Sequence, residues 1–214
     1  MSSNRRAWMQ GLAAVFAVSC LVTTPLGAAS AVESQDFASR STAGPADFTP
    51  FDQPTPPYTS NSCVLPLDGD DGQSYTQIPG CGAVVKVRAG TFHHGMTQRS
   101  VPADGWEQWG SPPDTEDSTP RILTTQKNSV RISFNKAATT GGVEIEPRGS
   151  GTHSFSVYFT SGQNGAGGTV GVITRDVTAD GGAKLFGATS SATFQSIVIV
   201  PNDNADFAVA QIRL

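Results

Sequence analysis

The stretch SVRISFNKAATTGGVEIEPRGSGTHSFSVYF, Ser129 to Phe159, decides the fold class. Large apolar residues occupy alternate positions in three of its segments, 130–134, 143–145 and 155–159. Strict alternation is typical of β-strands with one face on a core and the other in water. Gly and polar residues at 139–142 and 149–151 predict turns between the segments. The stretch therefore predicts three consecutive antiparallel strands.

Similar patterns occur on both sides of this stretch. We expect further strands at 83–88, 121–125, 169–177, 183–189, 194–200 and 206–214. Ile197–Val200 is apolar on both faces, which predicts a central strand. About nine short strands joined by Gly-rich turns are typical of an antiparallel two-sheet β-sandwich or jelly roll. The predicted fold class is therefore all-β, and we place a single sandwich domain at 62–214.

The first 31 residues have the pattern of an export signal peptide. Arg5 and Arg6 precede an apolar segment at 11–22 that is shorter than a membrane span of about 20 residues, and Ala29-Ser30-Ala31 is a small-residue cleavage site. The paired arginines also resemble a twin-arginine signal, although Gln10 departs from that pattern, so an ordinary Sec signal is the alternative and the export route stays open. We expect a secreted bacterial protein with no membrane insertion.

Residues 32–61 are rich in Pro, Ser and Thr and contain few large apolar residues, which predicts a linker or disordered arm. Charged residues make up only 15% of the chain, and the formal net charge is −4. Removal of Arg5 and Arg6 with the signal makes the mature chain more acidic. Such a surface does not favour nucleic acid or an anionic membrane, because both bind through basic clusters.

Loss of the signal also removes Cys20, which leaves Cys63 and Cys81. Two cysteines in an exported chain predict one disulfide. The loop between them contains Asp68, Asp70 and Asp71, and carboxylates interleaved with Gly are typical of calcium loops. The bidentate Glu of an EF-hand is missing, so we favour an acidic surface turn. No cofactor is expected, with calcium as the alternative at this turn.

The long segment from Gly90 to Pro120 is the leading candidate for a binding site, because irregular segments of this length in compact domains are usually functional or disordered. It contains Trp106-Glu107-Gln108-Trp109. The two indoles could form a platform on which sugar rings stack, with Glu107 and Gln108 as polar neighbours. The alternative is that both indoles pack over one end of the sandwich.

Two other groups of residues are candidates for chemistry. Glu144 and Glu146 share one face of a strand, and paired carboxylates are the catalytic groups of glycoside hydrolases. The alternation places them on the solvent side, so we favour a surface role. The histidines at 93, 94 and 153 lack zinc-ligand spacing, and we expect them to be structural or solvated.

From Val130 onward the chain resembles a recurring secreted bacterial β-sandwich module, similar to galactose-binding-like jelly rolls and found also in proteins with C-terminal sorting tails. The matching segments are SVRISFNKAATTGGVEIEP, TVGVITRDV, AKLFGATSSATFQSIVIV and NADFAVAQIRL. This chain differs from the module in lacking a sorting tail and in having Ala210-Gln211 where Asp is common. The resemblance implies the fold rather than an activity.

We therefore predict a secreted, monomeric, non-catalytic β-sandwich that binds extracellular glycan or cell-surface material through Trp106, Glu107, Gln108 and Trp109. A structural module that binds a protein partner is the first alternative. A glycan hydrolase or lyase that uses Glu144 and Glu146 is the second.

Overall fold

The computed structural model describes residues 47–90, 94–103, 105–126 and 128–214. The signal peptide expected at 1–31 and His93 lie outside these residues. The elements are β1 (Thr49–Phe51), α2 (Tyr58–Asn61), β2 (Ser74–Tyr75), β3 (Gln77–Gly80), β4 (Ala83–Ala89), β5 (Met96–Ser100), β6 (Arg121–Thr125), β7 (Val130–Pro147), β8 (Thr152–Thr160), η1 (Gln163–Gly165), β9 (Thr169–Thr178), η2 (Ala179–Gly181), β10 (Lys184–Pro201) and β11 (Phe207–Arg213). No helix among the described residues is long and apolar enough to cross a membrane.

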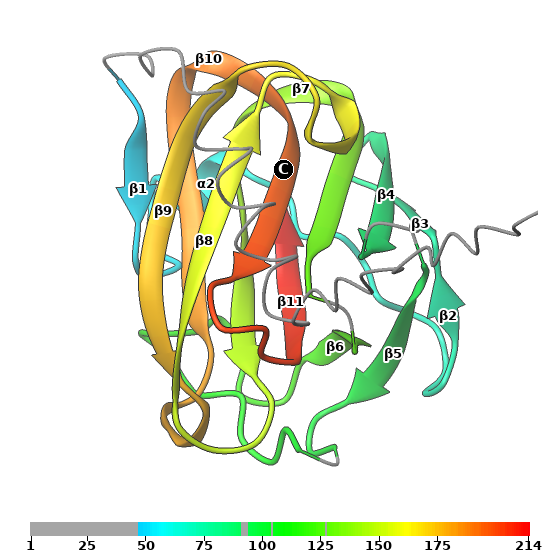
Figure 1. Ribbon diagram of the computed structural model, residues 1–214. Helices are drawn as coiled ribbons and strands as arrows, with labels where there is room; N and C mark the ends of the chain where they lie inside the picture. Colours follow the sequence, from blue (N-terminus) through cyan, green and yellow to red (C-terminus); the bar gives the residue numbers. More distant parts are fainter. Residues whose placement is uncertain (1–46, 91–93, 104, 127) are drawn as a thin grey trace, which may run out of the picture.

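The fold is an antiparallel β-sandwich in which two long strands, β7 and β10, run through both layers (Figure 1). The first half of β7 and the second half of β10 join β3, β4, β8 and β9 in one layer. The second half of β7 and the first half of β10 join β1, β11, β6, β5 and β2 in the other. The register between β7 and β10 shifts around Phe194, and such bulges bend a strand pair. The predicted all-β, two-sheet fold class is confirmed.

The core lies between the two layers and is formed by the alternating apolar residues. Phe155 on β8 meets Phe207 on β11 edge to face, with ring centroids 5.3 Å apart, so aromatic side chains join the two layers directly. Ile197 and Ile199 face this core, whereas Val198 and Val200 are buried on the opposite face of β10. The central position predicted for this segment is confirmed, because β10 pairs with β7 on one side and β8 on the other.

The turn predicted at 139–142 is wrong, because β7 continues through it. Gly141 and Gly142 serve close packing. A Cβ on Gly142 would lie 2.5 Å from the Cα of Gly187 and 2.6 Å from the hydroxyl oxygen of Tyr58. The predicted turn at 149–151 is present, with positive φ at both glycines. Likewise, the segments 183–189 and 194–200 are parts of one strand, β10.

The described part of the expected arm, residues 47–61, packs on the sandwich. β1 pairs with β10, and Tyr58 on α2 is completely buried. The chain then runs beside β11, where Cys63 and Leu214 exchange two backbone hydrogen bonds of 2.8 and 3.1 Å. The predicted disulfide between Cys63 and Cys81 is present, with the two Cα atoms 5.6 Å apart. The sandwich therefore includes residues assigned from sequence to the arm.

Candidate functional site

The segment after β5 folds over the outer face of the layer that contains β6, β11 and the second half of β7. We call this segment, between β5 and β6, the covering segment. A second apolar cluster, separate from the core, lies between it and the sheet, and its members are Val101, Trp106, Trp109, Ile122, Ala183, Ala208 and Ala210. The small alanines of β11 and of the position before β10 leave room for the two indoles. This covered face is where the polar side chains singled out from the sequence lie.

Trp109 and Trp106 do not form the open stacking platform that their spacing suggested. Trp109 has no exposed surface, and Trp106 is only 6% exposed. The indole Nε1 of Trp109 donates a 2.7 Å hydrogen bond to Oε2 of Glu144, and that of Trp106 donates a 3.3 Å bond to the carbonyl oxygen of Glu146. Both indoles are held against β7, because the covering segment needs large apolar side chains to exclude water from this face.

Glu144 is fully buried, which corrects the expected solvent-side position. Its two carboxylate oxygens accept hydrogen bonds from the Trp109 indole and, at 2.8 Å, from the backbone N–H of Glu116. Burial raises the pKa of the Glu144 carboxyl to about 7, although both hydrogen bonds favour the charged form and limit the rise. A carboxylate enclosed in this way holds the covering segment on the strand and cannot flank a glycosidic bond.

Glu146 lies on the same face and is 2% exposed, so its predicted solvent-side position is also wrong. Unlike Glu144, it has a side-chain oxygen, Oε2, with no hydrogen-bond partner among the described residues. Burial raises the pKa of the Glu146 carboxyl to about 8. A buried carboxyl oxygen without a partner is costly, and carboxyls with perturbed pKa values gather at functional sites.

Glu146 lines a small pocket of about 210 Å³ between the covering segment and η2. The other lining residues are Gly105, Glu107, Gln108, Gly149, Ala179 and Asp180. Glu107 and Gln108 are exposed here, so the structure brings these two predicted residues together with Glu146. We call this site the acidic pocket.

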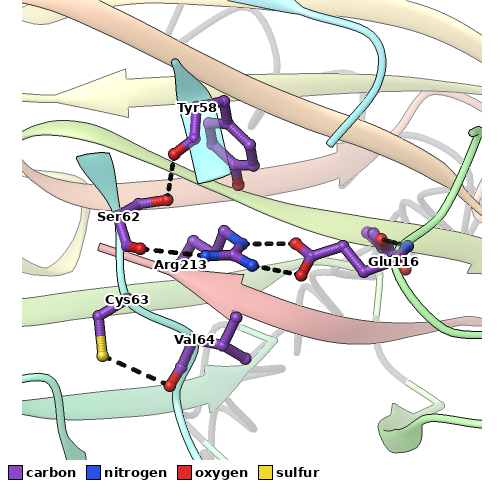
Figure 2. A network of polar contacts seen from close by, with 7 residues as sticks. Tyr58, Ser62, Cys63, Val64, Glu116 and Arg213 are labelled. Carbon is purple, nitrogen blue, oxygen red and sulfur yellow. Dashed lines mark hydrogen bonds and ion pairs between the residues drawn. The ribbon is translucent and has the colours of Figure 1, made fainter. Parts of the chain in front are cut away.

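A polar network joins the covering segment to the start of the domain (Figure 2). The guanidinium of Arg213 on β11 pairs with both carboxylate oxygens of Glu116 and donates a 3.0 Å hydrogen bond to the carbonyl oxygen of Ser62. The same guanidinium lies 5.8 Å from the ring centroid of Tyr58. A bidentate pair of this kind is directional, so it fixes Glu116 and, through its backbone N–H, supports Glu144.

A larger open groove of about 660 Å³ runs over the outer face of β5 and β6. Its lining residues are Asp71, His94, Gly95, Thr97, Arg99, Ser100, Pro102, Ala103, Trp106, Thr124, Thr125, Gln126 and Arg148. Arg148 lies over the Trp106 ring, 5.4 Å from its centroid. Most of these side chains carry hydroxyl, amide or guanidinium groups, so the groove offers many hydrogen-bond donors and acceptors.

Sequence reasoning missed this groove. The sequence did contain a pattern that pointed to this face. In the predicted strand at 121–125, Ile122 and Thr124 lie on one face and Leu123 lies on the opposite face. The segment 90–120 was expected to be irregular, whereas it contains the strand β5, and the pairing of Thr97 on β5 with Thr124 on β6 could not be predicted.

The remaining candidate residues do not form a site of their own, although Asp71 and His94 both line the groove. Asp71, one of the three aspartates of the predicted acidic turn, accepts a 2.8 Å hydrogen bond from the hydroxyl of Ser100. Within the described part of the chain, no group of three or more His, Cys, Asp or Glu side chains could hold a metal ion. Nδ1 of His153 lies 2.8 Å from Oδ2 of Asp203 at the surface, whereas His94 lines the groove.

Comparisons with known proteins give little guidance. No protein-family model matches the chain, and no curated protein matches it. Among solved structures it is similar to the CBM22-1–GH10 modules of endo-1,4-β-D-xylanase 10B from Clostridium thermocellum, determined with xylohexaose. The identity is 15% and the TM-score 0.28, over 72% of this chain and 25% of that one, so this chain spans about a quarter of that protein's solved length. A TM-score this low supports no inference about the function of this chain.

Proposed function

We propose that this protein is an exported, non-catalytic β-sandwich module that binds extracellular glycan or cell-surface material along the groove over β5 and β6. The observation that carries the proposal is the groove itself, an open channel of about 660 Å³ lined mainly by polar side chains. Binding sites fix their ligands through a few well-placed polar groups, and a chain of sugar hydroxyls needs many of them.

The groove has the chemistry that a polyhydroxylated ligand requires. Thr97 and Thr124 present hydroxyls from paired positions on β5 and β6, and Arg99 and Gln126 extend from the same two strands and their continuation. Hydroxyls accept from guanidinium and amide N–H groups and donate to amide oxygens. Trp106 lies at the groove with its ring covered by Arg148, so we assign it a supporting role in place of the stacking role predicted from sequence.

The disulfide supports an extracellular setting, because such bonds persist in oxidising compartments. The described residues expose large apolar side chains only singly, at Val84 and Val172. Obligate protein interfaces are larger and more apolar than the rest of a protein surface, so we expect a monomer with a glycan ligand ahead of a permanent protein partner.

The test is affinity electrophoresis of the mature protein in gels that contain soluble xylan, β-glucan, galactan or polygalacturonate. We expect retarded migration in at least one gel and no release of reducing ends from the polysaccharide. The double variant Arg99→Ala/Gln126→Ala should lose the retardation. The matched control Gln77→Ala/Lys86→Ala, which removes exposed residues from the other layer, should keep it. No retardation of the wild type in any gel would overturn the proposal and favour a protein partner.

A further inference from the structure

The acidic pocket is distinct from the groove, because the two sites share no lining residue. Its wall on the strand side is Glu146, whose carboxyl is buried and has one oxygen without a hydrogen-bond partner among the described residues. Its remaining polar lining comes from Glu107 and Gln108 on the covering segment and Asp180 on η2. A buried carboxylate oxygen without a partner calls for a structural explanation, and a ligand in the adjoining pocket would supply the missing donor.

We propose that the acidic pocket binds a primary ammonium group, with Glu146 as its inner acceptor and Glu107 and Asp180 as its outer carboxylates. An ammonium group has three N–H donors and no acceptor, which matches a lining that consists of carboxylate and amide oxygens. Neither Lys nor Arg is among the described lining residues, and the nearest described cation is Arg148, whose side chain lies beside Gly105 at the edge of the pocket.

The size of the pocket restricts the ligand to a terminal group. Its volume, about 210 Å³, lies below the range of roughly 300–1,000 Å³ that is typical of pockets for drug-sized molecules. An amino sugar at the end of a glycan and a lysine side chain both offer an ammonium group of suitable size. The shared chemistry is the ammonium, and calorimetry with matched probes distinguishes the two sources.

Proton exchange at Glu146 gives this binding a distinctive signature. Burial raises the pKa of Glu146 to about 8, so the carboxyl of the empty pocket is protonated at neutral pH. An ammonium beside it favours the ionised form, so binding should release a proton. The neighbouring charged groups are Glu107, Asp180, Glu144 and Arg148, and the facing residues of β11 and the segment before β10 are alanines.

The experiment is isothermal titration calorimetry of the mature protein with three probes: a glucosamine tetramer, its fully N-acetylated counterpart, and Nα-acetyl-lysine methylamide. We expect the glucosamine tetramer to bind and the acetylated tetramer to fail, because acetylation removes the charge. Binding of the lysine compound as well would identify the ammonium itself as the determinant. Failure of the lysine compound alone would restrict the source to amino sugars and leave the ammonium assignment in place.

Two sets of variants make the test specific. Glu146→Gln should weaken binding at least tenfold and abolish proton release, measured as the dependence of the binding enthalpy on buffer ionisation. Glu107→Gln/Asp180→Asn should weaken binding without abolishing proton release, whereas the matched control Asp70→Asn/Asp176→Asn should change neither. For an ammonium probe that stays charged, affinity of the wild type should rise about tenfold per pH unit from pH 6 to 7.

Equal affinity for the acetylated and free tetramers, or unchanged binding in both Glu146→Gln and Glu107→Gln/Asp180→Asn, would overturn the proposal. The groove variant Arg99→Ala/Gln126→Ala should retain ammonium binding. Its result therefore separates failure of the acidic pocket from failure of glycan binding in the groove.

Discussion

Glu146 should make the protein less stable as pH rises from 5 to 8. In the unfolded chain its carboxyl has an ordinary pKa near 4.5, whereas burial raises the pKa to about 8 in the folded protein. Between these values the folded state keeps a proton that the unfolded state has released. The free energy of unfolding then falls with rising pH, by at most about 1.4 kcal/mol per unit, and the effect ends as pH passes the folded pKa.

The substitution Glu146→Gln isolates this contribution, because glutamine keeps the shape of the side chain and does not titrate. Glu144 contributes with the same sign up to its own pKa of about 7, but it is present in both proteins and cancels in the difference. From pH 5 to 8 we expect the free energy of unfolding of the variant to rise relative to that of the wild type by up to about 4 kcal/mol.

Urea denaturation followed by tryptophan fluorescence at pH 5, 6, 7 and 8 measures both proteins. The fluorescence reports on the right region, since Trp106 and Trp109 cover the two carboxyls. Glu107→Gln, which removes an exposed carboxylate from the same segment, serves as the control. A difference between Glu146→Gln and wild type that stays constant across this range would refute the assignment of Glu146 as a buried, protonated acid.

Two other substitutions test the scaffold. Both carboxylate oxygens of Glu144 accept hydrogen bonds, one from Trp109 and one from Glu116. Glu144→Gln replaces one of these oxygens with an NH₂ group that cannot accept, so it should lower the free energy of unfolding by about 1–3 kcal/mol at pH 8. An unchanged urea midpoint would contradict this role. Removal of the disulfide by Cys63→Ala/Cys81→Ala opens a loop with a sequence separation of 18 and should cost about 3 kcal/mol, and a melting temperature equal to that of the oxidised wild type would be inconsistent with it.

Much of the fold was predictable because alternation is a local property. The apolar positions from Val130 to Phe159 identify the strands and the core-facing side correctly. The continuity of β7 was not predictable, because Gly141 and Gly142 have the composition of a turn. Residues distant in sequence, Gly187 and Tyr58, explain why no side chain fits at Gly142. A period of two shows which residues share a face and does not show whether another segment covers that face.

The same limit explains the candidate site. Glu144 and Glu146 were correctly placed on one face, but their burial depends on the segment that carries Trp106 and Trp109. The two indoles were singled out as an exposed pair, whereas their N–H groups are directed at β7. A long irregular segment with large aromatics opposite a strand with two acids is therefore as typical of a covered face as of an open site.

The path of β7 and β10 through both layers has a consequence for how the molecule opens. Neither layer can separate from the other intact, because β7 and β10 are interior strands of both layers. Opening one layer would break the hydrogen bonds between β7 and β10 in both layers. Amide hydrogens along these two strands should therefore exchange only through global unfolding, while peripheral pairs such as β2 with β5 exchange by local fraying. The strand wall of the acidic pocket, Glu146 on β7, would thus be lost only when the whole fold unfolds, whereas the β5 side of the groove could open by local fraying.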